Sequence, residues 1–120
     1  MILADTSVWV DHLRRGGGPL AGLLQEGEVL VHSFVVGELA CGHLRKRAEI
    51  LRLLSALPTL PKAGDEEILA FLDRRRLMGT GLGLIDVHLL ASCALADVPL
   101  WTRDATLERA ASRLGLAANP

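Results

Sequence analysis

The opening of the chain, MILADTSVWVD, constrains the fold more than any other stretch because it sets a carboxylate between a strand and a helix. The apolar residues before Asp5 form a short continuous run, which suits a central strand buried on both faces. Thr6 and Ser7 then supply the oxygen-bearing side chains with which helices often begin. Because ligands bind at the carboxyl ends of strands in parallel α/β sheets, Asp5 either caps the helix or belongs to a site at that edge.

Strand-like and helix-like segments alternate along the rest of the chain. We predict further strands over Glu28–Val31 and Val98–Trp101, and a short edge strand over Leu116–Ala117. The predicted helices are 6–13, 19–26, 34–44 with Ser33 as its N-cap, 48–57, 65–76, 84–96 and 105–114. This alternation predicts a three-layer α/β/α sandwich with a central, mainly parallel sheet, formed by a single domain over residues 1–120.

The composition excludes several classes of function. The formal charge of −1 gives no global attraction to nucleic acid, so such binding needs a local basic patch or a bound cation. Two Trp and two Phe residues are too few for a base-stacking platform. Cys41 and Cys93 have no paired spacing, so we expect two small buried side chains in a reducing compartment. The start of the chain does not match a signal peptide, and its longest apolar stretch is too short to cross a bilayer, which predicts a soluble cytoplasmic protein.

Three further carboxylates occupy positions comparable to that of Asp5. Glu38 lies on an apolar helical stretch, where a buried carboxylate needs a basic partner or a cation; the alternative is an exposed position on the polar edge of the helix. Asp86 falls in the first turn of the apolar helix 84–96, where it either stabilises the helix or faces a site. Asp104 follows the strand 98–101 and by itself is typical of a helix N-cap.

Together these acids predict a cation site at one edge of the sheet. Four converging carboxylates repel one another unless a cation lies between them. Oxygen ligands without a Cys or His pattern favour Mg²⁺ or Mn²⁺, and such an ion supports the hydrolysis of phosphodiesters. Ser7 and Thr102 adjoin two of the acids in sequence, where their hydroxyls either orient a ligand or water or make local capping bonds.

Four sequence blocks resemble the signature blocks of PIN-domain proteins, in particular the VapC-like toxins of toxin–antitoxin pairs. The blocks are DTSVWVD at 5–11, VGEL at 36–39, LIDVHLLA at 84–91 and WTRD at 101–104, and they span nearly the whole chain in the family's order. The resemblance implies a Mg²⁺- or Mn²⁺-dependent endoribonuclease that forms a homodimer and is inhibited by a cognate antitoxin. The family's functional positions carry over onto Asp5, Glu38, Asp86 and Asp104 as catalytic acids, with Asp5, Asp86 and Asp104 as metal ligands and with hydroxyls at Ser7 and Thr102. Asp11, further along the first helix, is left outside the predicted site.

Two interpretations of function stay open on the sequence alone. The first is a metal-dependent endoribonuclease that acts as a toxin on RNA. The second is a catalytically inactive PIN-fold interaction module that works through the predicted apolar helix hairpin Phe34–Leu57. A phosphatase is disfavoured because Ser7 stands where such an enzyme needs a second Asp. A receiver domain is disfavoured because it needs a lysine late in the chain, and the only lysines are Lys46 and Lys62.

The basic clusters and the hairpin predict surfaces for RNA and for an antitoxin. If the acids face RNA, one cluster among 14–15, 45–47 and 74–76 should hold phosphates, and Arg103 is the basic residue nearest the acids in sequence. We hypothesise that the Arg14–Arg15 pair contributes to RNA binding. An antitoxin segment is expected to lie across the hairpin, with an arginine that reaches toward the acids. The four histidines share no spacing, so each is expected to be a satisfied core residue or a surface residue.

Overall fold

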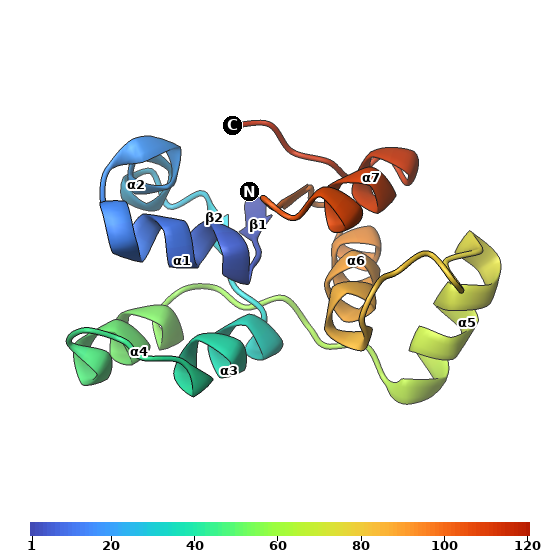
Figure 1. Cartoon of the computed structure of the whole chain (residues 1–120), viewed down its shortest axis with the longest axis horizontal. Coiled ribbons are helices and arrows are strands. Elements are labelled where there is room, and N and C mark those ends of the chain that lie inside the picture. Colours follow the sequence, from blue (N-terminus) through green and yellow to red (C-terminus); the bar gives the residue numbers. More distant parts are fainter.

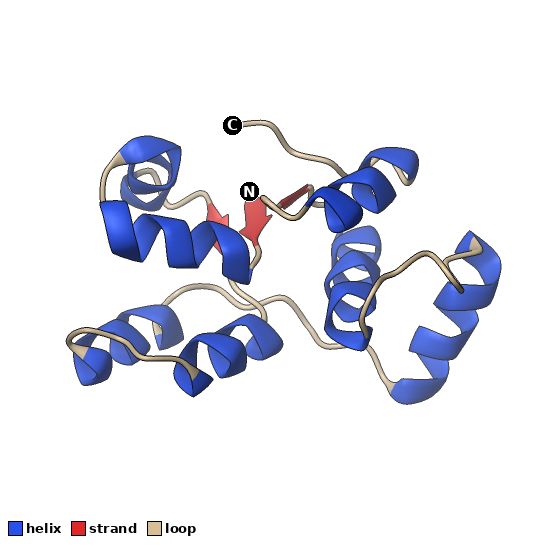
Figure 2. Ribbon diagram, viewed as in Figure 1, coloured by secondary structure: helices blue, strands red, loops and turns tan.

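The computed structural model describes residues 1–120 and is built around three short parallel strands. They are β1 (Ile2–Ala4), β2 (Val29–Leu30) and β3 (Leu100–Trp101), in the order β2-β1-β3. Leu3 pairs with Leu30 on one side and with Leu100 on the other, so β1 is central. The prediction of a mainly parallel sheet is confirmed, although β2 and β3 are each two residues shorter than predicted (Figure 2).

Isolated bridges extend this small sheet where longer strands were predicted. Val31 forms a parallel bridge with Thr59. The segment between Pro58 and Pro61, which follows the helix hairpin, therefore lies alongside the end of β2. Ala117 forms a parallel bridge with Leu100, so the predicted edge strand is reduced to a single bridge.

Seven helices flank the strands on two sides. They are α1 (Thr6–Arg15), α2 (Gly18–Gln25), α3 (Ser33–Cys41), α4 (Arg47–Ser55), α5 (Asp65–Arg75), α6 (Leu84–Ala96) and α7 (Ala105–Arg113). The helices α1 to α4 lie on one side of the strands and α5 to α7 on the other (Figure 1). The predicted three-layer α/β/α arrangement is therefore observed. None of these helices has the length and apolar character needed to cross a membrane.

The core explains why the carboxyl end of β1 is so well fixed. Leu3 and Ala4 have no exposed surface, and Leu90 of α6 and Leu107 of α7 are equally buried in the same cluster. Helix α6 is buried along most of its length, as its apolar sequence predicted. Since Asp5 follows Ala4 directly, its main chain leaves a packed strand and its side chain emerges at the sheet edge.

Two local predictions were wrong. Helix α3 begins at Ser33, and His32 is its N-cap: the His32 Nδ1 accepts a hydrogen bond from the Phe34 N–H at 3.1 Å. The His32 imidazole is fixed at the N-cap because its Nε2 is also hydrogen-bonded to the buried Ser92 hydroxyl at 3.2 Å, whereas Ser33 is exposed. Cys41 is exposed because α3 ends there, while Cys93 is buried as expected and its burial raises the pKa of the thiol to about 12.

Candidate active site

Asp5 is held at the carboxyl end of β1 by three hydrogen-bond donors. It is the N-cap of α1, and its Oδ1 accepts the Val8 N–H at 3.2 Å. The Ser7 hydroxyl donates to the same Oδ1 at 2.5 Å, and the Thr102 hydroxyl donates to Oδ2 at 2.5 Å. Only 6% of Asp5 is exposed. Capping and a role in a site are thus compatible, because a carboxylate has about four acceptor positions and three are used.

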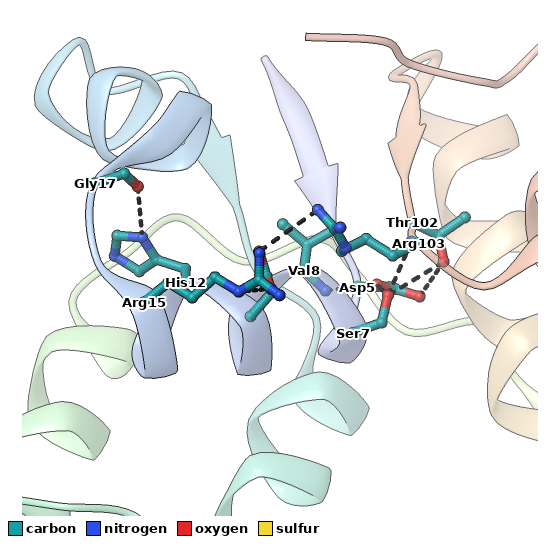
Figure 3. Close-up of polar contacts among 9 residues, drawn as sticks. Asp5, Ser7, Val8, His12, Arg15, Gly17, Thr102 and Arg103 are labelled. Carbon is teal, nitrogen blue, oxygen red and sulfur yellow. Dashed lines mark hydrogen bonds and ion pairs between the residues drawn. The ribbon is translucent and has the colours of Figure 1, made fainter.

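The loop between β3 and α7 holds the two hydroxyls in place. The Arg103 N–H donates to Ser7 Oγ at 2.9 Å, and the Asp104 N–H donates to Thr102 Oγ1 at 3.0 Å. Each hydroxyl has one proton and donates it to Asp5; Figure 3 shows both hydrogen bonds as dashed lines. Ser7 and Thr102 therefore position the Asp5 carboxylate, which is a more indirect role than orienting a ligand or a water.

Asp86 and Asp104 each stabilise a helix start with one carboxylate oxygen. Asp86 Oδ2 accepts the Gly83 N–H at 3.1 Å at the start of α6, and Asp104 Oδ1 accepts the Leu107 N–H at 2.9 Å as the N-cap of α7. Burial raises the pKa of the Asp86 carboxyl against the opposing Gly83 hydrogen bond, and the charges of Asp104 and Asp5 raise it further. The structure thus brings these three acids, from three distant segments, within electrostatic reach of one another.

Glu38 is linked to the first turn of α1 through Thr6, the residue after Asp5. Its Oε1 accepts a hydrogen bond from the Thr6 hydroxyl at 2.6 Å, which ties α3 to the residue directly after Asp5. The side chain is exposed, so the alternative of a surface position is the one observed. It lines a groove of about 620 Å³ between α1, α3 and the start of α4, together with Arg14 and Arg45.

The acids fit a hydrated hard cation more readily than a closed cage of protein ligands. No three His, Cys, Asp or Glu side chains are gathered closely enough to surround a metal ion. The acidic side chains therefore lie farther apart than the sequence predicted. Mg²⁺ usually keeps several waters and is held through one or two carboxylates, so it tolerates such spacing.

The hydrogen-bond and ion-pair partners of the acids also fit a cation. Asp5, Asp86 and Asp104 make no ion pair with any basic side chain. Asp86 and Asp104 each keep one carboxylate oxygen without a hydrogen-bond donor, namely Asp86 Oδ1 and Asp104 Oδ2. Carboxylate oxygens with unused lone pairs and no basic partner are the kind of donor that Mg²⁺ or Mn²⁺ prefers.

One cluster beside this site was not predicted from the sequence. Asp11 forms an ion pair with Arg15 at 3.2 Å and another with Arg103 at 3.4 Å. The i,i+4 spacing of Asp11 and Arg15 is a visible signal for the first pair. Nothing in the sequence pattern indicates the second pair, which joins α1 to the loop after β3.

Comparisons with known proteins bear on the family and the fold of this chain. The family described as "PIN domain" matches residues 2–113. The chain is 44% identical over 118 residues to a protein named Ribonuclease VapC32 in two strains of Mycobacterium tuberculosis, CDC 1551 / Oshkosh and H37Rv; the match covers 98% of this chain and 95% of that protein. A crystal structure of PAE2754 from Pyrobaculum aerophilum has a TM-score of 0.62 and 16% identity, and the match covers 91% of this chain and 78% of that one. The structural likeness shows a shared fold.

Proposed function

The chain belongs to the PIN domain family of VapC-type ribonucleases, and we propose that Asp5, Asp86 and Asp104 hold the divalent cation with which it cuts RNA. The observation that carries this proposal is that Asp5, Asp86 and Asp104 form no ion pair with a basic side chain. Asp86 and Asp104 also each keep one carboxylate oxygen without a hydrogen-bond donor. The raised pKa of the Asp86 carboxyl, caused by burial and by the charges of Asp104 and Asp5, is consistent with this arrangement. When bound, Mg²⁺ or Mn²⁺ supplies Lewis-acid chemistry that neutralises phosphodiester charge and makes water a better nucleophile.

The chain's own residues fix and complete this site. The Ser7 and Thr102 hydroxyls keep Asp5 in one orientation, so little reorganisation is needed when a cation arrives. Glu38 is proposed as the catalytic carboxylate that is not a metal ligand and that acts as a general base. Its Oε2 has no hydrogen-bond donor in the protein and is the atom available to accept a proton from an attacking water.

The groove beside Glu38 supports a toxin whose activity is restrained by an antitoxin. It is lined by apolar residues such as Val10, Leu39 and Ile50 and also by Glu38 and two arginines. An antitoxin segment in this groove would cover the catalytic acid directly. We further propose that residues 1–120 form one PIN-like domain, that the ion is Mg²⁺ or Mn²⁺, and that the protein works in the cytoplasm as a homodimer.

Cleavage of a panel of cellular RNAs, transfer RNAs included, tests the proposal. Cutting should require Mg²⁺ or Mn²⁺ and stop with chelator. Asp5→Asn should lower the rate by roughly a thousandfold, because a catalytic metal supplies several kcal/mol of transition-state stabilisation. Asp97→Asn is the matched control, since Asp97 caps the end of α6 in a left-handed conformation that Asn also adopts. Cutting that survives chelator, or an Asp5→Asn variant as active as the control, contradicts the proposal.

A further inference from the structure

A second hollow lies across α1 from the Glu38 groove. It has a volume of about 220 Å³ and is enclosed by the end of α1, the glycine run 16–18, the start of α2 and the loop after β3. Arg15 and Arg103 both line it, together with Asp11 and His12. Figure 3 shows the Arg15, Arg103 and His12 side chains. Arg14, which adjoins Arg15 in sequence, lines the Glu38 groove instead. The Arg14–Arg15 pair is thus divided between two surfaces.

The two arginines in this hollow are held by a single carboxylate. Arg15 Nε meets Asp11 Oδ1 at 3.2 Å, and Arg103 Nη1 meets Asp11 Oδ2 at 3.4 Å. Each guanidinium has five N–H donors and gives one nitrogen to Asp11, so most of its donors stay free. The Arg15 and Arg103 side chains are 77% and 54% exposed, which leaves those donors accessible to a ligand.

This arrangement is poorly explained as a device for stability. Ion pairs between exposed side chains contribute little to folding because water and salt screen them. Two cations share one anion, so the cluster keeps a net positive charge in a chain whose formal charge is −1. The start of α2 in the same hollow has no side-chain cap, and its free backbone N–H groups add to the positive potential.

Hydrogen bonds that begin at the Arg103 backbone connect the edge of this hollow to the carboxylate site. The Arg103 N–H donates to the Ser7 hydroxyl, and that hydroxyl donates to Asp5. The Arg103 side chain extends from the same loop to form its ion pair with Asp11. A polyanion bound at the acids therefore has a positively charged hollow one residue away.

We propose that Arg15 and Arg103 form a subsite for a backbone phosphate of the RNA, next to the phosphodiester that is cut, and that Asp11 is the residue that positions both guanidiniums. This inference rests on the proposed function. RNA that approaches three carboxylates is repelled unless positive charge lies close by, and the hollow supplies that charge on the side where Asp5 is anchored. Guanidiniums are suited to this task because they bind phosphate oxygens through two parallel hydrogen bonds.

Salt-dependent binding of a short, mixed-sequence, fluorescein-labelled single-stranded RNA tests the subsite. Binding is measured in an Asp86→Asn background, which prevents cutting. Arg103→Ala should weaken binding about tenfold and lower the slope of log K against log salt by about one, as expected for one lost phosphate contact. Arg15→Ala should act in the same direction. Arg52→Ala, an exposed arginine of α4 without an ion pair, is the matched control and should change neither quantity.

Asp11→Asn separates positioning from charge. The substitution removes a negative charge, so a purely electrostatic role of Asp11 predicts tighter binding of RNA. A positioning role predicts instead that the KM for cleavage rises. KM and kcat are measured with Asp11→Asn as the only substitution, and kcat should stay within a few-fold. An Arg103→Ala variant with the salt slope of Arg52→Ala overturns the subsite, as does an Asp11→Asn variant with a lowered KM. Failure of the proposed function is distinguishable, because then the protein without substitutions cuts no RNA in Mg²⁺ or Mn²⁺.

Discussion

The first turn of α1 touches two carboxylates that the fold holds in opposite ways. Asp5 is buried and receives three hydrogen bonds, from its own helix and from the segment after β3. Glu38 is exposed and receives one, from the Thr6 hydroxyl, at the edge of an open groove. The two acids are linked to neighbouring residues of one helix, yet only Asp5 has its orientation fixed before any ligand binds.

This difference indicates a division of labour. A carboxylate with fixed lone pairs suits a metal ligand, because hydrogen bonds from neighbouring groups orient it and tune its affinity. An exposed carboxylate with one free oxygen suits proton transfer and is open to competition from whatever enters the groove. The comparison makes predictions that differ for the two acids.

The largest expected effects are at the two carboxylates themselves. Glu38→Gln should lower the rate of RNA cleavage by at least about a hundredfold, because the amide cannot accept the proton of the attacking water. Its affinity for Mn²⁺, measured by isothermal titration calorimetry, should stay close to that of the unchanged protein. Asp5→Asn should lose both quantities. If Glu38→Gln loses Mn²⁺ affinity as severely as Asp5→Asn, the division of labour is wrong and Glu38 is itself a ligand.

A matched pair of threonine substitutions comes next in size. Thr102→Val removes the hydroxyl that donates to Asp5 Oδ2 and accepts the Asp104 N–H, so a buried carboxylate oxygen and a partly buried N–H lose their partner. We expect about 10- to 100-fold weaker metal affinity or activity and a loss of about 1–3 kcal/mol in the free energy of unfolding.

Thr6→Val makes the same chemical change on the Glu38 side. Water can replace the Thr6 hydroxyl at the exposed Glu38, so the effect on unfolding should stay within about 0.5 kcal/mol and metal affinity should not change. Urea unfolding and Mn²⁺ titration of both variants provide the measurement. Equal effects of the two substitutions would show that burial does not distinguish the two carboxylates.

Local rules predicted much of the Asp5 side from the sequence. A short apolar strand that ends in Asp, followed by Thr and Ser, gave both β1 and the start of α1. Asp86 in a first turn and Asp104 as an N-cap follow from the same preferences of helix starts. These features depend on neighbours within about four residues, so the sequence contains them.

Contacts between distant segments could not be predicted in this way. The Thr102 hydroxyl meets Asp5 across 97 positions of sequence, and Arg103 meets Asp11 only because β3 lies beside β1. The cap at His32 depends on a bond to Ser92, 60 residues away, so a rule that prefers serine at helix starts selected Ser33 wrongly. Such details need the register of the sheet and the packing of α6, which residue patterns do not specify.

The last prediction concerns how α3, the helix that carries Glu38, is anchored. Burial and, to a smaller extent, the nearby charges of His88 and Lys62 lower the pKa of His32 from 6.5 to about 4. The unfolded chain therefore binds more protons than the folded one between these values, so the free energy of unfolding should fall as the pH drops from 6.5 toward about 4. His32→Asn keeps a side chain that caps helices well but cannot titrate. Between about pH 7 and about pH 5, urea unfolding of this variant should lose less stability than the unchanged protein, by of order 1 kcal/mol. Equal losses in the two proteins would mean that His32 does not couple proton binding to folding, and that α3 is anchored by packing alone.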